Sequence, residues 1–213
     1  FTFHGKRRPY ITLKWAQSAD GYIDALRQEG DGLMPVTFSS PASAMRVHRL
    51  RALSDAILVG RRTAMLDNPS LTTRLWPGRN PLRLVIDREA TLGMSLKLFD
   101  GTTKTIVFTD VFRDFESEEN IEQVLLDFKR DILPQMMEYL HARKVQRLLV
   151  EGGAVLLQRF VDSGLWDEAF VEEVPFSLGS GVKAPSIDKS CKKEEIESFG
   201  HQISHFLHEK HIF

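Results

Sequence analysis

One segment of the sequence combines a carboxylate with two consecutive glycines, where an apolar run gives way to a helical pattern. Glu151-Gly152-Gly153 follows the run 145–150, and the helical pattern after it ends at Gly164. The glycines permit a close backbone approach and a positive φ, and the free N–H groups of a helix start favour an anion such as a pyrophosphate. A strand-to-helix turn without any ligand would use similar glycines. Glu151, at the end of a strand that we expect to be central, could accept hydrogen bonds from sugar hydroxyls.

A lysine lies inside the first apolar run of the chain. Lys14 belongs to a strand expected over 10–16, which a turn at Asp20-Gly21 follows. On such a strand, a lysine either faces a ligand-filled cleft or lies at an exposed sheet edge, and the sequence favours neither alternative.

Arginines are concentrated in one part of the chain. Between Arg46 and Arg88 there are nine of the seventeen arginines and no lysine, opposed only by Asp55, Asp67 and Asp87, so this window carries about +6. Guanidinium groups bind phosphate well, which suggests a small phosphorylated ligand, although a solvated arginine-rich face is equally open. Because the whole chain is close to neutral, with 28 basic and 29 acidic side chains, we expect no nucleic acid as a partner.

Several chemistries are excluded or disfavoured. The single cysteine, Cys191, excludes an intrachain disulfide and any multi-cysteine metal site. Histidines recur at three- and four-residue steps near the end, at His201, His205, His208 and His211, but the residues between them favour a strand over a metal-binding helix face. We therefore expect no metal. The G-x-G-x-x-G, P-loop and G-x-S-x-G motifs are absent. No apolar run approaches the roughly 18 residues of a membrane span, so we expect a cytoplasmic protein with no membrane partner.

The remaining pattern predicts one α/β domain over residues 1–213. A chain of 213 residues with 42% hydrophobic residues can bury a core of its own. Short β-branched runs alternate with helical patterns, which indicates a mostly parallel sheet. Two stretches have a plainer interpretation: turn chemistry for the polar loop 66–74, and a solvated excursion for the acidic stretch 114–122. We predict helices over 41–53, over 131–142 and after Gly153, the first of them with an N-cap at Ser39-Ser40. We predict strands over 10–16, 55–59, 82–86, 105–109, 145–150 and 169–174 and from residue 202 onward, and we expect the last two of these strands to be antiparallel.

Six segments, in order, resemble the reductase domain of the riboflavin-biosynthesis deaminase-reductase family. They are RPYITLKWAQSADG (8–21), HRLRA (48–52), DAILVG (55–60) with Thr63, DNPSLTTR (67–74), PLRLVID (81–87) and VEGG (150–153). The resemblance implies a fold similar to dihydrofolate reductase: a mostly parallel central sheet flanked by helices, with antiparallel C-terminal strands. It also implies NADPH-dependent reduction of 5-amino-6-(5-phosphoribosylamino)uracil, a phosphorylated pyrimidine-ribose, by hydride transfer to the anomeric carbon of the ribose.

The same resemblance implies roles for individual residues. Lys14 and Glu151 would be catalytic and contact the ribose hydroxyls, with Lys14 a candidate to polarise or protonate the ring-opened nitrogen or oxygen. Arg88 occupies a position beside the cofactor where the family often has serine; from its charge, and not from the resemblance, we infer that it could meet the 2′-phosphate of the cofactor. The substrate site would comprise Arg51, Leu71, Arg74 and Glu151, and the NADPH site would comprise Ala16, Thr63, Asp67, Arg88, Gly153, Ala154, Val155 and Leu156.

The sequence departs from the family in two places. The family usually carries a Ser-x-Trp-Ile-[ST] segment, and the matching stretch 35–39 here, PVTFS, lacks the tryptophan. The zinc deaminase motifs H-A-E and P-C-x-x-C are also absent, so this chain neither binds zinc nor deaminates. We expect a homodimeric reductase domain that a longer protein fuses to a deaminase; a free-standing reductase is the alternative. Another dihydrofolate-reductase-like reductase, acting on a pterin or another carbonyl or imine, and a non-catalytic nucleotide-binding domain stay open.

Overall fold

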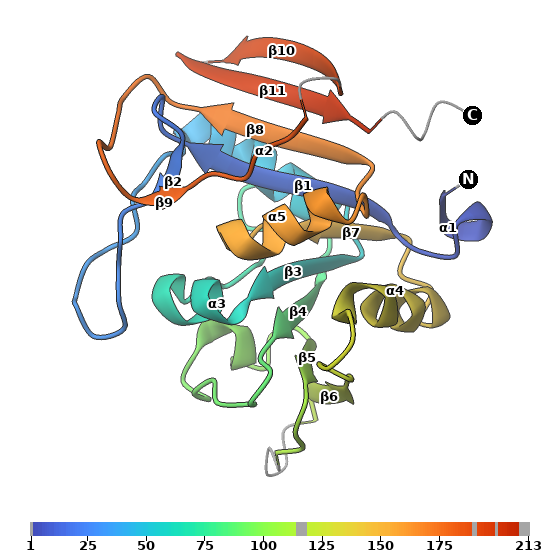
Figure 1. Cartoon of the computed structure of the whole chain (residues 1–213). Helices are drawn as coiled ribbons and strands as arrows, with labels where there is room; N and C mark the ends of the chain where they lie inside the picture. Colours follow the sequence, from blue (N-terminus) through green and yellow to red (C-terminus); the bar gives the residue numbers. More distant parts are fainter. Residues whose placement is uncertain (1, 114–118, 189–190, 199, 209–213) are drawn as a thin grey trace.

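The computed structural model describes residues 2–113, 119–188, 191–198 and 200–208. Strands and helices alternate along most of the chain, as the sequence pattern predicts (Figure 1). The elements are α1 (Thr2–Gly5), β1 (Tyr10–Gln17), β2 (Tyr22–Asp24), α2 (Pro41–Ala52), β3 (Ala56–Gly60), α3 (Arg61–Asp67), β4 (Leu82–Ile86), a 3₁₀ turn (Lys97–Phe99), β5 (Thr105–Thr109), β6 (Ile121–Leu125), α4 (Ile132–Ala142), β7 (Arg147–Val150), α5 (Ala154–Asp162), β8 (Glu168–Glu173), β9 (Val182–Lys183), β10 (Lys192–Ser198) and β11 (His201–Leu207).

The central sheet has the strand order β10-β11-β8-β1-β7-β3-β4-β5-β6. All neighbours from β8 to β6 pair in parallel, whereas β11 pairs antiparallel with both β8 and β10. The predicted mostly parallel sheet is confirmed, and so are antiparallel strands at its C-terminal end. The first antiparallel strand is β11. The strand before it, β8, was also expected to be antiparallel, but it runs parallel to its other neighbour, β1 (Figure 1). In this order β7 and β1 are central, as predicted for the strand that precedes Glu151.

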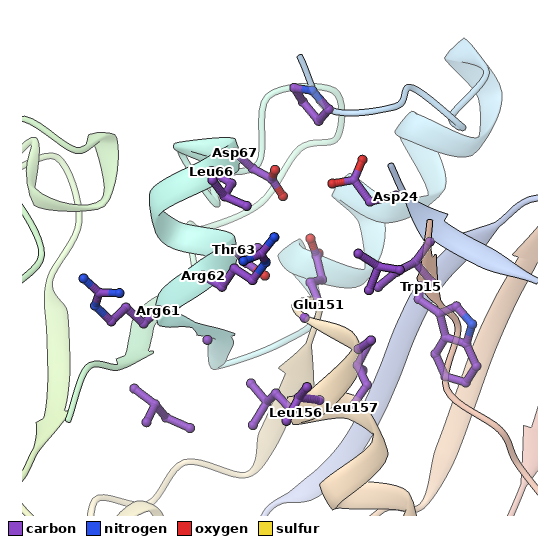
Figure 2. A pocket seen from close by; sticks show the side chains of 18 of the residues that line it. Trp15, Asp24, Arg61, Arg62, Thr63, Leu66, Asp67, Glu151, Leu156 and Leu157 are labelled. Carbon is purple, nitrogen blue, oxygen red and sulfur yellow. The ribbon is translucent and has the colours of Figure 1, made fainter. Parts of the chain in front are cut away.

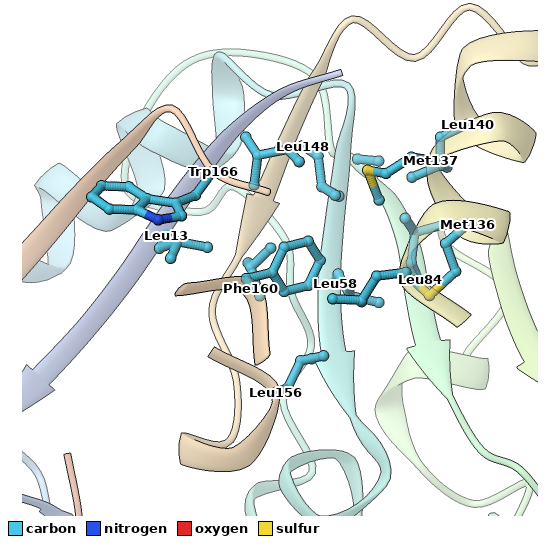
Figure 3. Packing of buried hydrophobic residues seen from close by; sticks show 14 of the residues in the cluster. Leu13, Leu58, Leu84, Met136, Met137, Leu140, Leu148, Leu156, Phe160 and Trp166 are labelled. Atoms are coloured by element: carbon cyan, nitrogen blue, oxygen red, sulfur yellow. The ribbon is translucent and has the colours of Figure 1, made fainter. Parts of the chain in front are cut away.

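The apolar runs form strands because both faces of the parallel sheet are covered. In β3, residues 56–59 are at most 1% exposed, and alternate residues point into two different clusters. Leu58 packs with side chains of α4 and α5, such as Met136 and Phe160 (Figure 3). Ile57 packs in a second cluster, which Leu50 of α2 also joins. The sheet therefore has α4 and α5 on one face and α2 on the other.

Helix starts follow the capping residues of the sequence. Ser40 caps α2, because its hydroxyl accepts the N–H of Ser43 at 3.2 Å and Pro41 occupies the first turn. Asp131 caps α4 in the same way, by accepting the N–H of Leu133. Within the part of the chain that the structure describes, no helix is long and apolar enough to cross a bilayer; α2, the longest, has 12 residues.

Two stretches near the sheet edges differ from the prediction. The acidic stretch 114–122 was expected to be a solvated excursion, and residues 114–118 lie outside the described residues. Glu122, however, belongs to β6, which extends the parallel sheet beside β5. Its carboxylate accepts the Tyr139 hydroxyl at 2.5 Å and pairs with Lys104 at 2.6 Å, and these contacts outweigh the low strand propensity of acidic residues. The edge strand β10 was not predicted, because five of its seven residues are lysine or glutamate, which are depleted in strands.

The recurring histidines belong to a strand, as expected from the residues between them. His201 and His205 lie in β11 and contact two different glutamates of β8, Glu172 and Glu168. His208 follows the strand, and His211 lies outside the described residues. Among the residues with described positions, no three His, Cys, Asp or Glu side chains gather to hold a metal ion.

Candidate active site

A cavity of about 840 Å³ lies at the carboxyl ends of the parallel strands. Ala16, Gly60, Ile86 and Glu151 bring the ends of β1, β3, β4 and β7 to its lining. Residues of α3, of α5 and of the segment between β2 and α2 complete its walls. In Figure 2 the Glu151 side chain lies between α3, which carries Thr63, and β1. Open α/β sheets bind ligands at this end of their strands, and the volume suits a small molecule or cofactor.

The glycine pair after β7 forms a turn that larger residues could not make. A Cβ on Gly152 would lie 2.9 Å from Cγ2 of Thr63 and 3.0 Å from Cγ1 of Val59. Gly153 has a φ of 76° and is the N-cap of α5, with no side chain to accept the first N–H groups of the helix. These N–H groups lie at the cavity, since Gly153 and Ala154 both line it. Uncapped N–H groups at a helix start can bind an anion, and a strand-to-helix turn without a ligand would have the same backbone geometry, so both alternatives that the sequence left open remain.

Lys14 lies in the cleft and not at an exposed edge. β1 is flanked by β7 and β8, and the Lys14 side chain is only 14% exposed and lines the cavity. Its ammonium lies 3.8 Å from a carboxylate oxygen of Glu172, a residue that no sequence motif marks as part of the site. Burial lowers the pKa of Lys14, and the carboxylates of Glu172 and Glu151 oppose that effect.

Glu151 forms a two-point ion pair with Arg51 of α2. Nε of Arg51 donates to Oε1 at 2.9 Å and Nη2 donates to Oε2 at 2.6 Å, while Nη1 donates to the carbonyl of Thr72 at 3.2 Å. Burial alone would raise the pKa of Glu151, but the charges of Arg51 and Lys14 outweigh it and the pKa is lowered. The carboxylate is therefore ionised at neutral pH. Arg51 was predicted to hold a substrate phosphate, yet in this structure its guanidinium faces Glu151 and does not line the cavity.

The polar loop 66–74 places the other two predicted substrate residues outside the cavity lining. Leu71 is 2% exposed, has a φ of 54° and packs in the second cluster. Arg74 is exposed; its backbone N–H donates to Nδ1 of His48 at 2.8 Å and its Nη1 donates to Oγ1 of Thr72 at 3.0 Å. Burial, together with the charges of Arg51 and Arg74, lowers the pKa of His48. The neutral imidazole can therefore accept the Arg74 N–H at Nδ1, and this bond holds the loop 66–74 in place.

The residues predicted for the cofactor come together. Of these, Arg88 is largely exposed: its side chain is 60% exposed, its Nε lies 3.3 Å from Asp110, and its guanidinium lies over the ring of Phe128. Asp67 is more enclosed, and burial raises its pKa. The side chains or backbone of all eight line the cavity: Ala16, Thr63, Asp67, Arg88, Gly153, Ala154, Val155 and Leu156.

Arg27 is a part of the site that sequence reasoning missed. It is 3% exposed, its Nε donates to Asp24 at 2.7 Å, its Nη1 donates to the carbonyl of Leu66 at 3.0 Å, and its Nη2 pairs with Asp67. These bonds tie the segment between β2 and α2 to the end of α3. Figure 2 shows Asp24 and Asp67, the two carboxylates that Arg27 contacts, facing each other at the cavity. No local signal marks this arginine, because its neighbours 28–32 read as a polar turn.

The segment 35–39, where the expected tryptophan is missing, still contributes an aromatic ring. Phe38 lines the cavity, is 8% exposed and stacks on Phe176 with ring centroids 5.8 Å apart and planes at 8°. Pro35 and Val36 also line the cavity. The departure from the family motif therefore changes the residue types at this wall and keeps its apolar character.

The sequence matches a family model described as RibD C-terminal domain over residues 9–204. It is 32% identical over 220 residues to the riboflavin biosynthesis protein RibD of Aquifex aeolicus, an alignment that covers 97% of this chain and 60% of that protein. It is 30% identical over 214 residues to the 2,5-diamino-6-ribosylamino-4(3H)-pyrimidinone 5′-phosphate reductase of Archaeoglobus fulgidus, covering 91% of this chain and 94% of that protein.

The fold is similar to those of solved reductases. A diaminohydroxyphosphoribosylaminopyrimidine deaminase/5-amino-6-(5-phosphoribosylamino)uracil reductase from Thermotoga maritima superposes with a TM-score of 0.82 at 28% identity, over 97% of this chain and 58% of that chain. Dihydrofolate reductase from Enterococcus faecalis superposes with a TM-score of 0.52 at 16% identity, over 93% and 95% of the two chains, which shows a likeness of fold alone. The chain thus spans about 60% of the Aquifex and Thermotoga proteins and nearly all of the Archaeoglobus one.

Proposed function

This chain belongs to the family of RibD C-terminal domains, the reductases of riboflavin biosynthesis, and on that premise we propose that it reduces 5-amino-6-(5-phosphoribosylamino)uracil with NADPH. The product would be the ribitylamino phosphate. One observation carries the proposal: Lys14 and Glu151 line the same cavity as the glycine turn that opens α5. An ammonium, a carboxylate and the uncapped N–H groups of a helix start therefore share one site, which supports a role for them in binding and reducing a phosphorylated substrate.

The cofactor side of this proposal fits the residues present. The first turn of α5 supplies N–H groups without a side-chain cap, Gly153 lines the cavity at the start of that helix, and Arg88 offers a largely exposed guanidinium at the cavity that could bind a 2′-phosphate. When bound, NADPH supplies the hydride that reduces the anomeric carbon. The chain's own task is to hold the two reactants together and to exclude water.

The substrate side rests on Lys14 and Glu151. Glu151 is ionised and could accept hydrogen bonds from ribose hydroxyls with the lone pairs that Arg51 leaves available. As the hydride reaches the anomeric carbon, the bond from that carbon to the ring oxygen breaks, and the oxygen must gain a proton. Lys14 is the ammonium that lines the cavity beside Glu151, and we assign this proton to it.

Arg74 is the strongest candidate for the substrate phosphate. Four arginines of the basic window pair with carboxylates, and these are Arg51, Arg61, Arg83 and Arg88. Among the described residues, the Arg74 guanidinium donates one hydrogen bond, to Thr72, and is exposed. A phosphate could therefore take its remaining donors, provided that the ribose chain extends from the cavity over the loop 66–74.

We further propose that this chain works as a homodimer and as the C-terminal part of a longer protein with a zinc deaminase domain. The second statement is supported by the share of the Aquifex protein that the chain spans, which leaves room for a further domain of that relative. The Archaeoglobus relative, which the chain spans almost entirely, supports a second candidate substrate, the 2,5-diamino-6-ribosylamino-pyrimidinone phosphate named for that protein.

NADPH oxidation by the purified chain distinguishes the two substrates. We expect turnover with the deaminated uracil compound and at least about tenfold lower kcat/KM with the diamino precursor, a difference of about 1.4 kcal/mol. The reverse preference would favour the second candidate. A matched variant, Lys14→Met, should lose turnover while NADPH still binds with a similar Kd. Turnover with neither compound, or full activity of Lys14→Met, would contradict the proposal.

A further inference from the structure

Glu172 of β8 is a buried carboxylate that bridges two other strands. Its side chain is 4% exposed, and its two oxygens have different partners. Oε1 lies 2.6 Å from Nδ1 of His201 on β11, and Oε2 lies 3.8 Å from the Lys14 ammonium on β1. A buried carboxylate requires such partners to remain charged, so the three side chains form one electrostatic unit.

The charges around Lys14 come from three elements. Glu172 faces it from β8, Glu151 from the end of β7, and Arg51 from α2. Arg51 donates two hydrogen bonds to Glu151 and so balances the charge of that carboxylate. Of the two carboxylates that face Lys14, Glu172 is therefore the one whose charge is not already balanced by an arginine. Because Glu172 does not line the cavity, it reaches the reaction only through Lys14.

The same three strands carry a second, nearly identical constellation. Glu168, on the same face of β8, accepts the Thr12 hydroxyl at 2.8 Å and lies 3.0 Å from Nε2 of His205. Here the residue of β1 is a threonine, which carries no charge and does not line the cavity. A glutamate–histidine contact between β8 and β11 is therefore a repeated feature of this sheet, and only one copy of it ends at a cationic group in the cleft.

From this difference we propose that Glu172, oriented by His201, keeps the Lys14 ammonium charged and aimed into the cavity, and so acts as a positioning residue for the proton transfer of the proposed reduction. This inference rests on the proposed function. His201 contributes by holding Oε1, which fixes the carboxylate so that Oε2 stays near Lys14. Burial disfavours the charged form of Lys14, and Glu172 is placed to compensate for that loss.

The pH dependence of kcat tests the proposal, with Glu172→Gln as the main variant and Glu168→Gln as the matched control. A reduction that needs protonated Lys14 loses activity as the pH rises through the pKa of this lysine. Removing the Glu172 charge lowers that pKa further, so the alkaline limb of the kcat–pH profile should move to lower pH by about one unit or more. Glu168→Gln should leave the limb in place. An unmoved limb in Glu172→Gln, or an equal shift in Glu168→Gln, would overturn the assignment.

Two further measurements keep the test decisive. His201→Ala should lower kcat, and His201→Gln, which keeps an N–H donor, should restore most of it; equal losses in both would argue against an orienting bond. The pKa of Lys14 can also be followed by NMR of ¹³Cε-labelled lysine in the chain without substrate, using Lys14→Met to assign the signal. A lower pKa in Glu172→Gln supports the inference even if the wild-type chain reduces neither pyrimidine, and an unchanged pKa overturns it even if the chain is active.

Discussion

Two buried arginine–carboxylate pairs lie at opposite ends of the parallel strands and have almost the same geometry. Arg8 and Asp167, which precede β1 and β8, form bonds of 2.6 and 3.1 Å, and Arg51 and Glu151 form bonds of 2.6 and 2.9 Å at the other end. The surroundings differ. Asp167 also accepts the backbone N–H of Ile11 at 2.7 Å, and neither member of its pair lines the cavity. Glu151 lines the cavity and lies beside Lys14.

The comparison teaches that the chemistry of a pair does not reveal its role. Backbone N–H groups at the amino ends of strands can be satisfied by a carboxylate, and the pair Arg8–Asp167 anchors the starts of β1 and β8 in this way. At the carboxyl ends, the same pair holds a charged acceptor against open space where a ligand can bind. We therefore expect one pair to govern stability and the other to govern turnover.

The largest effect is expected from Asp167→Asn. The amide cannot balance the Arg8 charge or accept from all the donors of the carboxylate, so the free energy of unfolding should fall by about 3–5 kcal/mol, measured by urea denaturation. The activity of the fraction that remains folded should stay close to that of the wild type. In the double variant with Arg8→Met, part of the stability should return, because no uncompensated charge is left. If Asp167→Asn were as stable as the wild type, the pair Arg8–Asp167 would not govern stability, and the proposed difference between the two pairs would be wrong.

The matched change in the other pair, Glu151→Gln, should act mainly on catalysis. We expect kcat to fall about 100-fold, equivalent to roughly 2.7 kcal/mol, because the carboxylate that receives the ribose hydroxyls is lost. The unfolding free energy should fall less than in Asp167→Asn, since Arg51 keeps its bond to Thr72. Comparing kcat and urea midpoints of the two isosteric variants checks this directly. A larger loss of stability than of activity in Glu151→Gln would assign both pairs to the same structural role.

A smaller effect is expected for Arg74, an arginine of the basic window with no carboxylate partner among the residues that the structure describes. Arg74→Ala should raise the substrate KM about tenfold, roughly 1.4 kcal/mol, and leave the Kd of NADPH nearly unchanged. Arg79→Ala is the control, because it removes an exposed arginine a few residues further along the same stretch. Equal KM changes in the two variants would mean that general positive charge matters, and a weaker NADPH affinity in Arg74→Ala would move this arginine to the cofactor side.

The sequence predicted local structure well, for reasons that act over a few residues. Runs such as 82–86 and 105–109 form strands with the predicted bounds, since a buried parallel strand requires apolar residues on both faces. Ser40 and Asp131 begin helices because a short polar side chain can accept the first N–H groups. Gly152 and Gly153 are glycines because Thr63 and a positive φ exclude a larger residue. The residues 8–21 and 150–153 also carried the family resemblance.

The partners of the charged groups were decided only by the tertiary structure. Lys14 could have faced either a cleft or an edge, and the strand order, with β7 and β8 on either side of β1, settles it. Arg51 meets Glu151, which is 100 residues away in the chain, and Glu172 reaches Lys14 because β8 pairs with β1. A charge acts on whatever lies within a few ångströms in space, whereas sequence patterns report neighbours along the chain. The sequence by itself thus determined the elements, the glycine turn and the kinds of groups available for catalysis, and the folding of nine strands into one sheet determined which of those groups act on one another.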